Sequence, residues 1–240
     1  MIPDMNLLVC FALKEEAAPF RKMAAGMGAV AQTASILITG IGRQNAEKSL
    51  REFLATHSPE LVLTCGFAGG LNPNLKLGDV VFELTDRRGE LHEPQTEKES
   101  GTRVTHPSES SPRREKLSAA GAKPVKFFCA DRIATTVDEK KKLRAETGAD
   151  AVEMESAAIH AICRERGIPC ATVRGISDTA SEDLPLDFNQ LTKPDRNLDF
   201  SKLAWTIAKS PGKIGALLKL QKKTRFAAEK LASVLGKIIW

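Results

Sequence analysis

The sequence predicts an α/β fold: a single three-layer domain in which helices flank a central, twisted, mixed and mostly parallel sheet. Two observations carry this prediction. Short apolar runs alternate with helical patterns along the chain, as they do in parallel sheets with crossover helices. Hydrophobic residues make up 42% of the 240 residues, which is enough for one large core. We expect residues 1–200 to form this domain, and residues 201–240 to form basic amphipathic helices that pack on it or extend from it.

The expected strands are compact apolar runs that end at glycine, acid or turn residues. They span residues 6–12, 36–40, 61–65, 78–84, 125–129 and 168–176. The expected helices are a segment from residue 14 onward, with acids in its first turn, and residues 44–55, 137–147 and 200–240, the last one broken at residues 210–212. Residues 85–112 and 183–199 are polar and contain proline, so they predict loops.

The charge of the chain is concentrated at its C-terminal end. Residues 201–240 carry nine Lys and Arg against one acid, although the whole chain has a formal net charge of only +5. Three interpretations stay open: a surface helix whose apolar face packs on the body, a helix that docks on an anionic membrane, and an oligomer contact. Nucleic-acid binding is not expected, because no aromatic platform or groove-reading motif accompanies the lysines.

Targeting and metal signals are not evident. No apolar run reaches the roughly 18 residues of a membrane span, and the first residues do not resemble a signal peptide. The five cysteines show no CxxC pairing, and the four histidines show no metal-ligand spacing. We therefore expect a cytoplasmic protein with reduced thiols, no metal and no cofactor, with or without peripheral contact at the inner membrane surface.

Residues 150–180 are expected to carry the chemistry. Glu153, Met154 and Glu155 stand where a short apolar run gives way to a helix rich in Ala and Ile, and Asp178 follows the apolar run at residues 168–176. Carboxylates at such strand ends would face one crevice of the sheet. Two carboxyl groups in one crevice can take different pKa values and different roles.

Two glycine runs follow predicted strands, Gly40-Ile41-Gly42 and Gly66-Phe67-Ala68-Gly69-Gly70. Each predicts a turn at which the backbone can approach a ligand closely. Taken alone, each is equally typical of a tight turn packed against a helix.

Taken in order, five motifs resemble the purine nucleoside phosphorylase and methylthioadenosine/S-adenosylhomocysteine nucleosidase superfamily over roughly residues 6–190. The motifs are Ala12-Leu13-Lys14-Glu15-Glu16, the two glycine runs with Arg43-Gln44-Asn45-Ala46 after the first and Leu77-Gly78-Asp79-Val80-Val81 after the second, Val152-Glu153-Met154-Glu155-Ser156, and Val173-Arg174-Gly175-Ile176-Ser177-Asp178. The run Ala130-Asp131-Arg132-Ile133-Ala134-Thr135, Thr147-Gly148-Ala149 and the basic C-terminal helices are also similar to the hopanoid-associated phosphorylase branch. That branch implies an adenosylhopane-like, lipid-linked nucleoside as substrate.

The resemblance implies a role for each of three carboxyl groups in breaking an N-glycosidic bond. Asp178, next to Ser177, matches the acid that meets the imidazole nitrogen of the leaving purine, and burial would have to keep it protonated. Glu155 matches the carboxylate that holds the ribose hydroxyls, with Met154 packing against the sugar. Glu16 matches the acid that positions the attacking water. Without the resemblance, Asp178 would be interpreted as a helix cap, Met154 as core and Glu16 as a first-turn helix acid.

Other site residues are implied more loosely. Gly66, Ile133 and Phe188 match positions around the base, Phe188 as an aromatic lid or simply as a loop anchor. Phe67 departs from the family, which commonly has Ser there, so a hydroxyl for phosphate or ribose is missing. Arg43, Arg174 and Gly42 are candidate anion contacts, although Arg174 can equally pair with a carboxylate such as Glu155 or Glu16.

The sequence therefore predicts an enzyme that releases adenine from an adenosine-type nucleoside by hydrolysis. The nearest alternative is a phosphorylase on the same fold, with phosphate as co-substrate. An alternative of another class is a nucleoside-binding, membrane-associated protein without turnover. A homodimer or higher homo-oligomer is expected from the resemblance.

Overall fold

The computed structural model describes residues 6–26, 34–84, 112–191, 212 and 214–239. Its centre is an eight-stranded sheet in the order β2-β1-β3-β8-β4-β5, with β7 paired to β3 and β6 paired to β7. The strands are β1 (Leu7–Phe11), β2 (Ala34–Ile38), β3 (Leu61–Gly70), β4 (Val80–Leu84), β5 (Lys123–Pro124), β6 (Phe127–Cys129), β7 (Ala151–Glu153) and β8 (Cys170–Asp178). Five of the seven strand pairings are parallel and two are antiparallel. The predicted mixed, mostly parallel sheet is confirmed.

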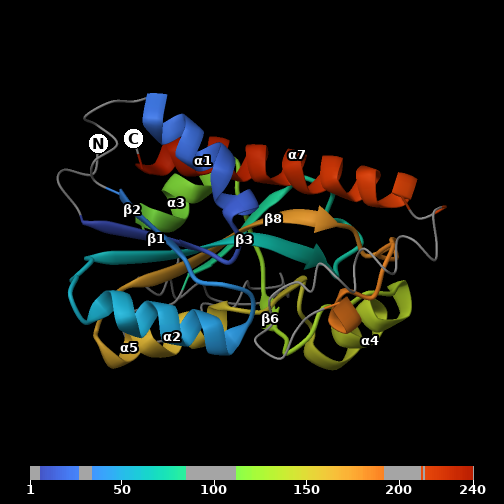
Figure 1. Ribbon diagram of the computed structural model, residues 1–240, viewed down its shortest axis with the longest axis horizontal. Coiled ribbons are helices and arrows are strands. Elements are labelled where there is room, and N and C mark those ends of the chain that lie inside the picture. The colour runs from blue at the N-terminus through green and yellow to red at the C-terminus, as the bar shows by residue number, and fades with distance from the viewer. Residues whose placement is uncertain (1–5, 27–33, 85–111, 192–211, 213, 240) are drawn as a thin grey trace, which may run out of the picture.

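Helices cover both faces of this sheet, as Figure 1 shows. They are α1 (Lys14–Gly26), α2 (Arg43–Leu54), α3 (Pro112–Ala119), α4 (Val137–Thr147), α5 (Ser156–Glu165), the short 3-10 helix η2 (Phe188–Leu191) and α7 (Ile214–Ile239). Helices α1, α3 and α7 lie on one face and α2 and α5 on the other (Figure 1). Helix α3 and strand β5 were not predicted. The predicted loop at residues 85–112, apart from Pro112, and the predicted helix at residues 200–210 lie outside the described residues.

Strand β1 contributes side chains to the hydrophobic core on both faces of the sheet. Its side chains alternate, as strand geometry requires. Val9 and Phe11 belong to the core cluster that α1 and α7 cover, whereas Leu8 and Cys10 belong to the cluster that α2 and α5 cover. All four are at most 1% exposed, so the strand is apolar at every position. The sequence predicted it for that reason.

The second glycine run corrects a sequence prediction. We expected a turn after a strand ending near residue 65, but β3 continues extended through Gly70. The cause is pairing with partners distant in sequence: β8 runs parallel to β3 as far as Gly69, and β7 pairs with Gly69 and Gly70. A β-bulge between Ala68 and Gly69 shifts the register there. The first run does form a turn, with φ of 84° at Gly40 and 85° at Gly42.

Helix α7 divides into two halves. Its second half is buried against α1 and β8, with Leu231 1% and Leu235 0% exposed. A Cβ on Gly175 of β8 would lie 2.9 Å from a backbone oxygen of α7, so this glycine permits the close packing. The first half instead exposes Ile214 and Leu218. The apolar face of α7 therefore packs on the body of the domain in the second half of the helix.

Candidate active site

A cavity opens at the carboxyl ends of the central strands. Its volume is about 200 Å³, far more than the roughly 10–15 Å³ that one water requires. It is lined by residues that follow β1, β2 and β7, by the second half of β3, by the end of β8, and by side chains from η2 and α7. This is where open α/β sheets generally bind their ligands.

Most of the predicted site residues meet in this cavity, although they come from separate parts of the chain. Those that line it are Glu16, Phe67, Ile133, Met154, Glu155, Ser177, Asp178 and Phe188. Those that do not line it are Gly42, Arg43, Gly66 and Arg174. The three predicted catalytic carboxyl groups are therefore in one place, and the candidate anion contacts are behind or beside it.

Glu16 is fixed by backbone hydrogen bonds. Its Oε2 accepts from the N–H of Leu13 at 3.0 Å, within its own first turn, and its Oε1 accepts from the N–H of Phe67 at 2.9 Å. The side chain thus connects the start of α1 to β3. Burial raises the pKa of Glu16, although the Arg174 charge and the backbone N–H groups oppose that rise.

Arg174, which does not line the cavity, forms an ion pair with Glu153, which does. The Arg174 Nη2 lies 2.6 Å from Glu153 Oε2 and 3.3 Å from Glu155 Oε2, and its side chain is 1% exposed. Nη1 and Nη2 also donate to the carbonyl of Cys65 and the hydroxyl of Thr64. The structure therefore has the internal pairing that the sequence left open for Arg174.

Glu153 is satisfied within the fold. Its Oε2 accepts from the N–H groups of Glu155 and Ser156, and its Oε1 accepts from Ser156 Oγ at 2.6 Å. Burial alone would raise its pKa, but the Arg174 charge and these hydrogen bonds bring it below the ordinary value. Glu153 is therefore the structural counter-ion of Arg174.

The Glu155 carboxyl group has fewer hydrogen bonds than that of Glu153 and a more distant positive charge. Its Oε1 accepts from the N–H of Gly42 at 2.8 Å, and Arg174 lies farther from it than from Glu153. Burial raises the pKa of Glu155 to about 7, helped by the neighbouring charges of Glu153 and Glu16 and opposed by Arg174. The N–H of Gly42, a candidate anion contact, thus donates to a carboxyl group of the protein itself. A proton on Glu155 can be gained or lost near neutral pH.

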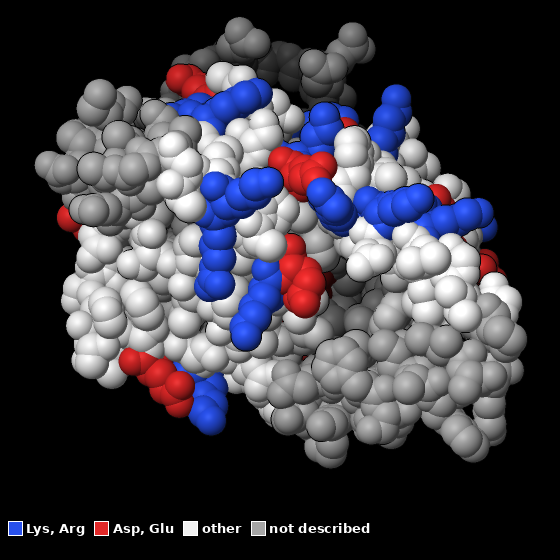
Figure 2. Space-filling view, turned by 45° about the horizontal axis from the view of Figure 1, so that its top comes forward, with Lys and Arg blue, Asp and Glu red and all other residues white. Residues whose placement is uncertain are grey.

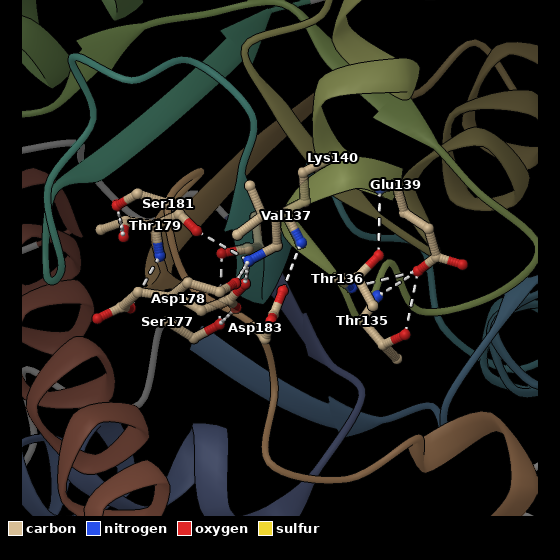
Figure 3. Close-up of polar contacts among 12 residues, drawn as sticks. Thr135, Thr136, Val137, Glu139, Lys140, Ser177, Asp178, Thr179, Ser181 and Asp183 are labelled. Atoms are coloured by element: carbon tan, nitrogen blue, oxygen red, sulfur yellow. Dashed lines mark hydrogen bonds and ion pairs between the residues drawn. The ribbon is translucent and has the colours of Figure 1, made fainter.

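Asp178 stands apart from the Arg174 cluster, at the end of β8. Its Oδ1 accepts from Ser177 Oγ at 2.7 Å, and its Oδ2 lies 2.5 Å from Lys140 Nζ of α4. Lys140 was not predicted from the sequence, because it lies in a run of charged residues that gives no sign of which one turns inward. Figure 3 shows this group of side chains.

The remaining wall is held together by Asn189. Its amide group exchanges two hydrogen bonds of 2.9 Å with the backbone of Ile133, so the segment carrying Phe188 is attached to the segment carrying Ile133. Asn189 was not predicted either.

Arg43 lies outside the cavity, with its Nη2 3.5 Å from the carbonyl oxygen of Cys129 and 3.7 Å from Asp131 Oδ1.

Fold and site together define the class of protein. A family model described as the phosphorylase superfamily matches residues 9–209, and the chain belongs to that superfamily. Among curated relatives, a 5′-methylthioadenosine/S-adenosylhomocysteine nucleosidase from Shewanella halifaxensis is 29% identical over 164 residues, which is 63% of this chain and 71% of that protein. The corresponding nucleosidase from Glaesserella parasuis is 28% identical over 167 residues, 65% of this chain and 72% of that protein.

Solved structures share the fold over nearly the whole chain. The nucleosidase of Neisseria meningitidis, in complex with methylthio-immucillin-A, superposes with a TM-score of 0.65 at 20% identity and covers 97% of both chains. Futalosine hydrolase of Helicobacter pylori gives a TM-score of 0.60 at 20% identity, over 96% of this chain and 97% of that one. The family and these relatives confirm the prediction of an enzyme of the nucleosidase and nucleoside phosphorylase class.

Metal-ligating side chains do not cluster in the described part of the chain. Within it, no three His, Cys, Asp or Glu side chains gather closely enough to hold a metal ion. Among the described helices, none is long and apolar enough to cross a membrane.

Proposed function

We propose that this protein hydrolyses the N-glycosidic bond of an adenosine-type purine nucleoside and releases adenine. The observation that carries the proposal is the meeting of Glu16, Glu155 and Asp178, from α1, from the end of β7 and from the end of β8, in one cavity. The relatives named as nucleosidases support the same reaction class.

The three carboxyl groups suit the three tasks of such a reaction. The bond between the sugar carbon and the purine breaks with its electron pair going to the purine, whose imidazole nitrogen takes a proton from Asp178. A water oxygen bonds to the sugar carbon, and its proton goes to Glu16. Glu155 accepts the ribose hydroxyl hydrogens, and its charge stabilises the positive charge that develops on the sugar.

Hydrolysis is favoured over phosphorolysis by the state of the nearby cations. Arg174 is buried and engaged by Glu153. Among the lining residues that the structure describes, the basic side chain is Arg132, which is engaged by Glu139. Phe67 adds an apolar wall where the family commonly has a hydroxyl. A dianionic phosphate would therefore meet four lining carboxyl groups, those of Glu16, Glu153, Glu155 and Asp178, and few available positive charges.

The test is release of adenine from adenosine derivatives in phosphate-free buffer, with and without added phosphate. We expect the same rate in both. Strict dependence on phosphate would establish the phosphorylase alternative. Asp178→Asn separates both enzymes from a protein that only binds: we expect a loss of at least about 100-fold, the scale of general acid catalysis. If the wild type releases no adenine and Asp178→Asn binds nucleosides as well as the wild type does, the hypothesis of a nucleoside-binding protein without turnover is favoured.

For the substrate, we propose an apolar group at the 5′ position of the ribose, as in a lipid-linked, adenosylhopane-like nucleoside. The cavity wall includes Leu184, Phe188 and Leu220. On α7, Leu217 lies three residues before Leu220, and Ile214, which is 44% exposed, lies three residues before Leu217. Side chains three residues apart are neighbours on a helix, so apolar surface continues from the cavity to the outside. A series of adenosines with 5′ groups of increasing alkyl length should show KM falling with length. An optimum at the unsubstituted 5′ hydroxyl would refute this.

The same half of α7 supports a peripheral contact with an anionic membrane. Ile214 and Leu218 are exposed there, and Lys219, Lys222 and Arg225 are exposed beside them. Figure 2, which brings the α7 side of the molecule forward, shows basic side chains spread over this face. Vesicles containing anionic lipid should sediment the wild type but not Leu218→Glu, and neutral vesicles should sediment neither. Equal sedimentation of both proteins would refute the contact. The homodimer stays a prediction, which sedimentation equilibrium can test.

A further inference from the structure

Lys140 is a buried cation that the proposed reaction does not yet use. It belongs to the first turn of α4, and its side chain is 0% exposed. An ammonium group has three N–H donors, and three oxygens surround this one. Nζ donates to the carbonyl of Thr179 at 2.8 Å and to that of Glu182 at 2.7 Å, and it lies 2.5 Å from Asp178 Oδ2. Lysine is rarely buried this fully unless it is paired.

All three oxygens belong to one stretch of chain, the end of β8 and the turn that follows it. Lys140 therefore attaches the Asp178 carboxyl group and the next four residues to α4. Figure 3 shows this arrangement, with α4 on one side and residues 177–183 on the other. Oδ1 of Asp178 is held separately by Ser177. Oδ1 thus has a hydrogen-bond partner, whereas buried Oδ2 has no hydrogen bond and is held by the Lys140 charge. Together the two contacts restrict rotation of the group.

The helix that carries Lys140 is itself anchored at this point. Thr136 and Glu139 form a capping box at the start of α4. The N–H of Val137 donates to Asp183 Oδ1 at 2.6 Å, and the N–H of Leu184 donates to the carbonyl of Thr135 at 2.8 Å. These contacts join α4 to the same segment without Lys140. The fold of the segment therefore does not depend on Lys140 alone, and its effect on Asp178 can be measured separately.

We infer that Lys140 is a positioning residue that sets the orientation of the Asp178 carboxyl group toward the purine. The inference rests on the proposed function, in which Asp178 gives a proton to the leaving base. A displacement of about 1 Å in a catalytic group can cost on the order of 100-fold in rate. Losing Lys140 removes one of the two contacts that orient this group and leaves the other, from Ser177.

A double-mutant cycle on adenine release tests this directly. Lys140→Met should lower kcat at least about 10-fold with KM changed less than about threefold, because the ribose contacts are elsewhere. In the Asp178→Asn background, the same substitution should change the rate less than about twofold. If the rate of the Asp178→Asn variants is too low to measure, the same double-mutant cycle can be built from the Kd of adenine for each variant, measured by calorimetry. Lys140→Gln, which keeps two donors but not the charge, serves if Lys140→Met does not fold.

Lys223 provides the matched control. Its Nζ lies 2.6 Å from Glu182 Oε1, so it contacts the same segment but not Asp178. Lys223→Met should keep kcat within about twofold of the wild type. Two results would overturn the inference: an equal loss from Lys140→Met in the wild-type and Asp178→Asn backgrounds, or a loss from Lys223→Met as large as from Lys140→Met. A wild type that releases no adenine would instead refute the proposed function.

Discussion

Gly66 gives the sharpest prediction about how the site is built. A Cβ at this position would lie 2.6 Å from Arg174 Nη1 and 2.7 Å from Glu16 Oε1, and its φ is +143°. Neither neighbour can move freely. Arg174 is bound to Glu153 at 2.6 Å, and Glu16 is held by the N–H groups of Phe67 and Leu13. Gly66→Ala must therefore displace a buried charged group or the strand itself.

The magnitude follows from two separate costs. A non-glycine residue in this backbone region costs roughly 1–3 kcal/mol. Forcing an extra methyl group into a packed site costs a further 1–3 kcal/mol or so. We expect the free energy of unfolding to fall by roughly 2–6 kcal/mol in all. Because Glu16 is one of the displaced groups, kcat should also fall by on the order of 100-fold.

Gly121 is the control for this experiment. It also has positive φ, +100°, but nothing lies within 4 Å of a Cβ placed there. Gly121→Ala should cost only the backbone strain, roughly 1–3 kcal/mol, and should leave adenine release unchanged. Urea unfolding and adenine release are measured for both variants. If Gly66→Ala matched Gly121→Ala in stability and in rate, the packing argument for the Glu16 and Arg174 pocket would be wrong.

Four further predictions concern the charged cluster. Because Glu155 has a pKa of about 7 and must be ionised to hold ribose, kcat/KM should fall as the pH drops below about 7; a rate independent of pH between 5 and 8 would contradict this. Because the fold raises the pKa of Glu155 from 4.5 to about 7, Glu155 contributes stability that is fully present below pH 4.5 and is lost as the pH rises through about 7. Glu155→Gln should therefore make the free energy of unfolding, measured with urea, less dependent on pH between 4.5 and 7. Glu153→Ala leaves Arg174 without its nearest counter-ion and should cost about 3–5 kcal/mol, whereas a loss below 1 kcal/mol would show the pair to be dispensable. A nucleoside analogue with a positive charge in its sugar ring should bind more tightly at pH 8 than at pH 6, and calorimetry showing equal affinity would exclude an anionic sugar site.

What the sequence could predict was local. Apolar runs indicated the central strands, and the acids next to them, Glu16, Glu155 and Asp178, line the cavity as expected from strand ends. A buried strand with no polar alternation, such as β1, is recognisable without knowing its neighbours. The family resemblance added which acid has which proposed role, a matter that spacing alone does not determine.

What the sequence could not predict depended on contacts between distant segments. The glycine run in β3 has the composition of a turn, but β8 and β7 pair with it and keep it extended. Lys140 stands among other lysines in a helix with little apolar pattern, and only the position of the turn after β8 selects it. Asn189 likewise acquires its role by meeting Ile133, 56 positions away. Local propensity contains no information on such pairings.

The charges of the site explain why the cavity should stabilise a positive charge on the bound sugar. Arg174 is closest to Glu153, and its positive charge lowers the pKa of that carboxyl group. The Arg174 charge is therefore balanced mainly by a residue that has no role in the proposed chemistry. Burial raises the pKa of both Glu16 and Glu155, because the same guanidinium cannot fully balance three carboxyl groups. Relative to water, the site therefore disfavours the ionised forms of Glu16 and Glu155. A positive charge on the sugar would supply the missing counter-ion and favour their ionised forms, so the site stabilises such a charge more than it stabilises a neutral ligand.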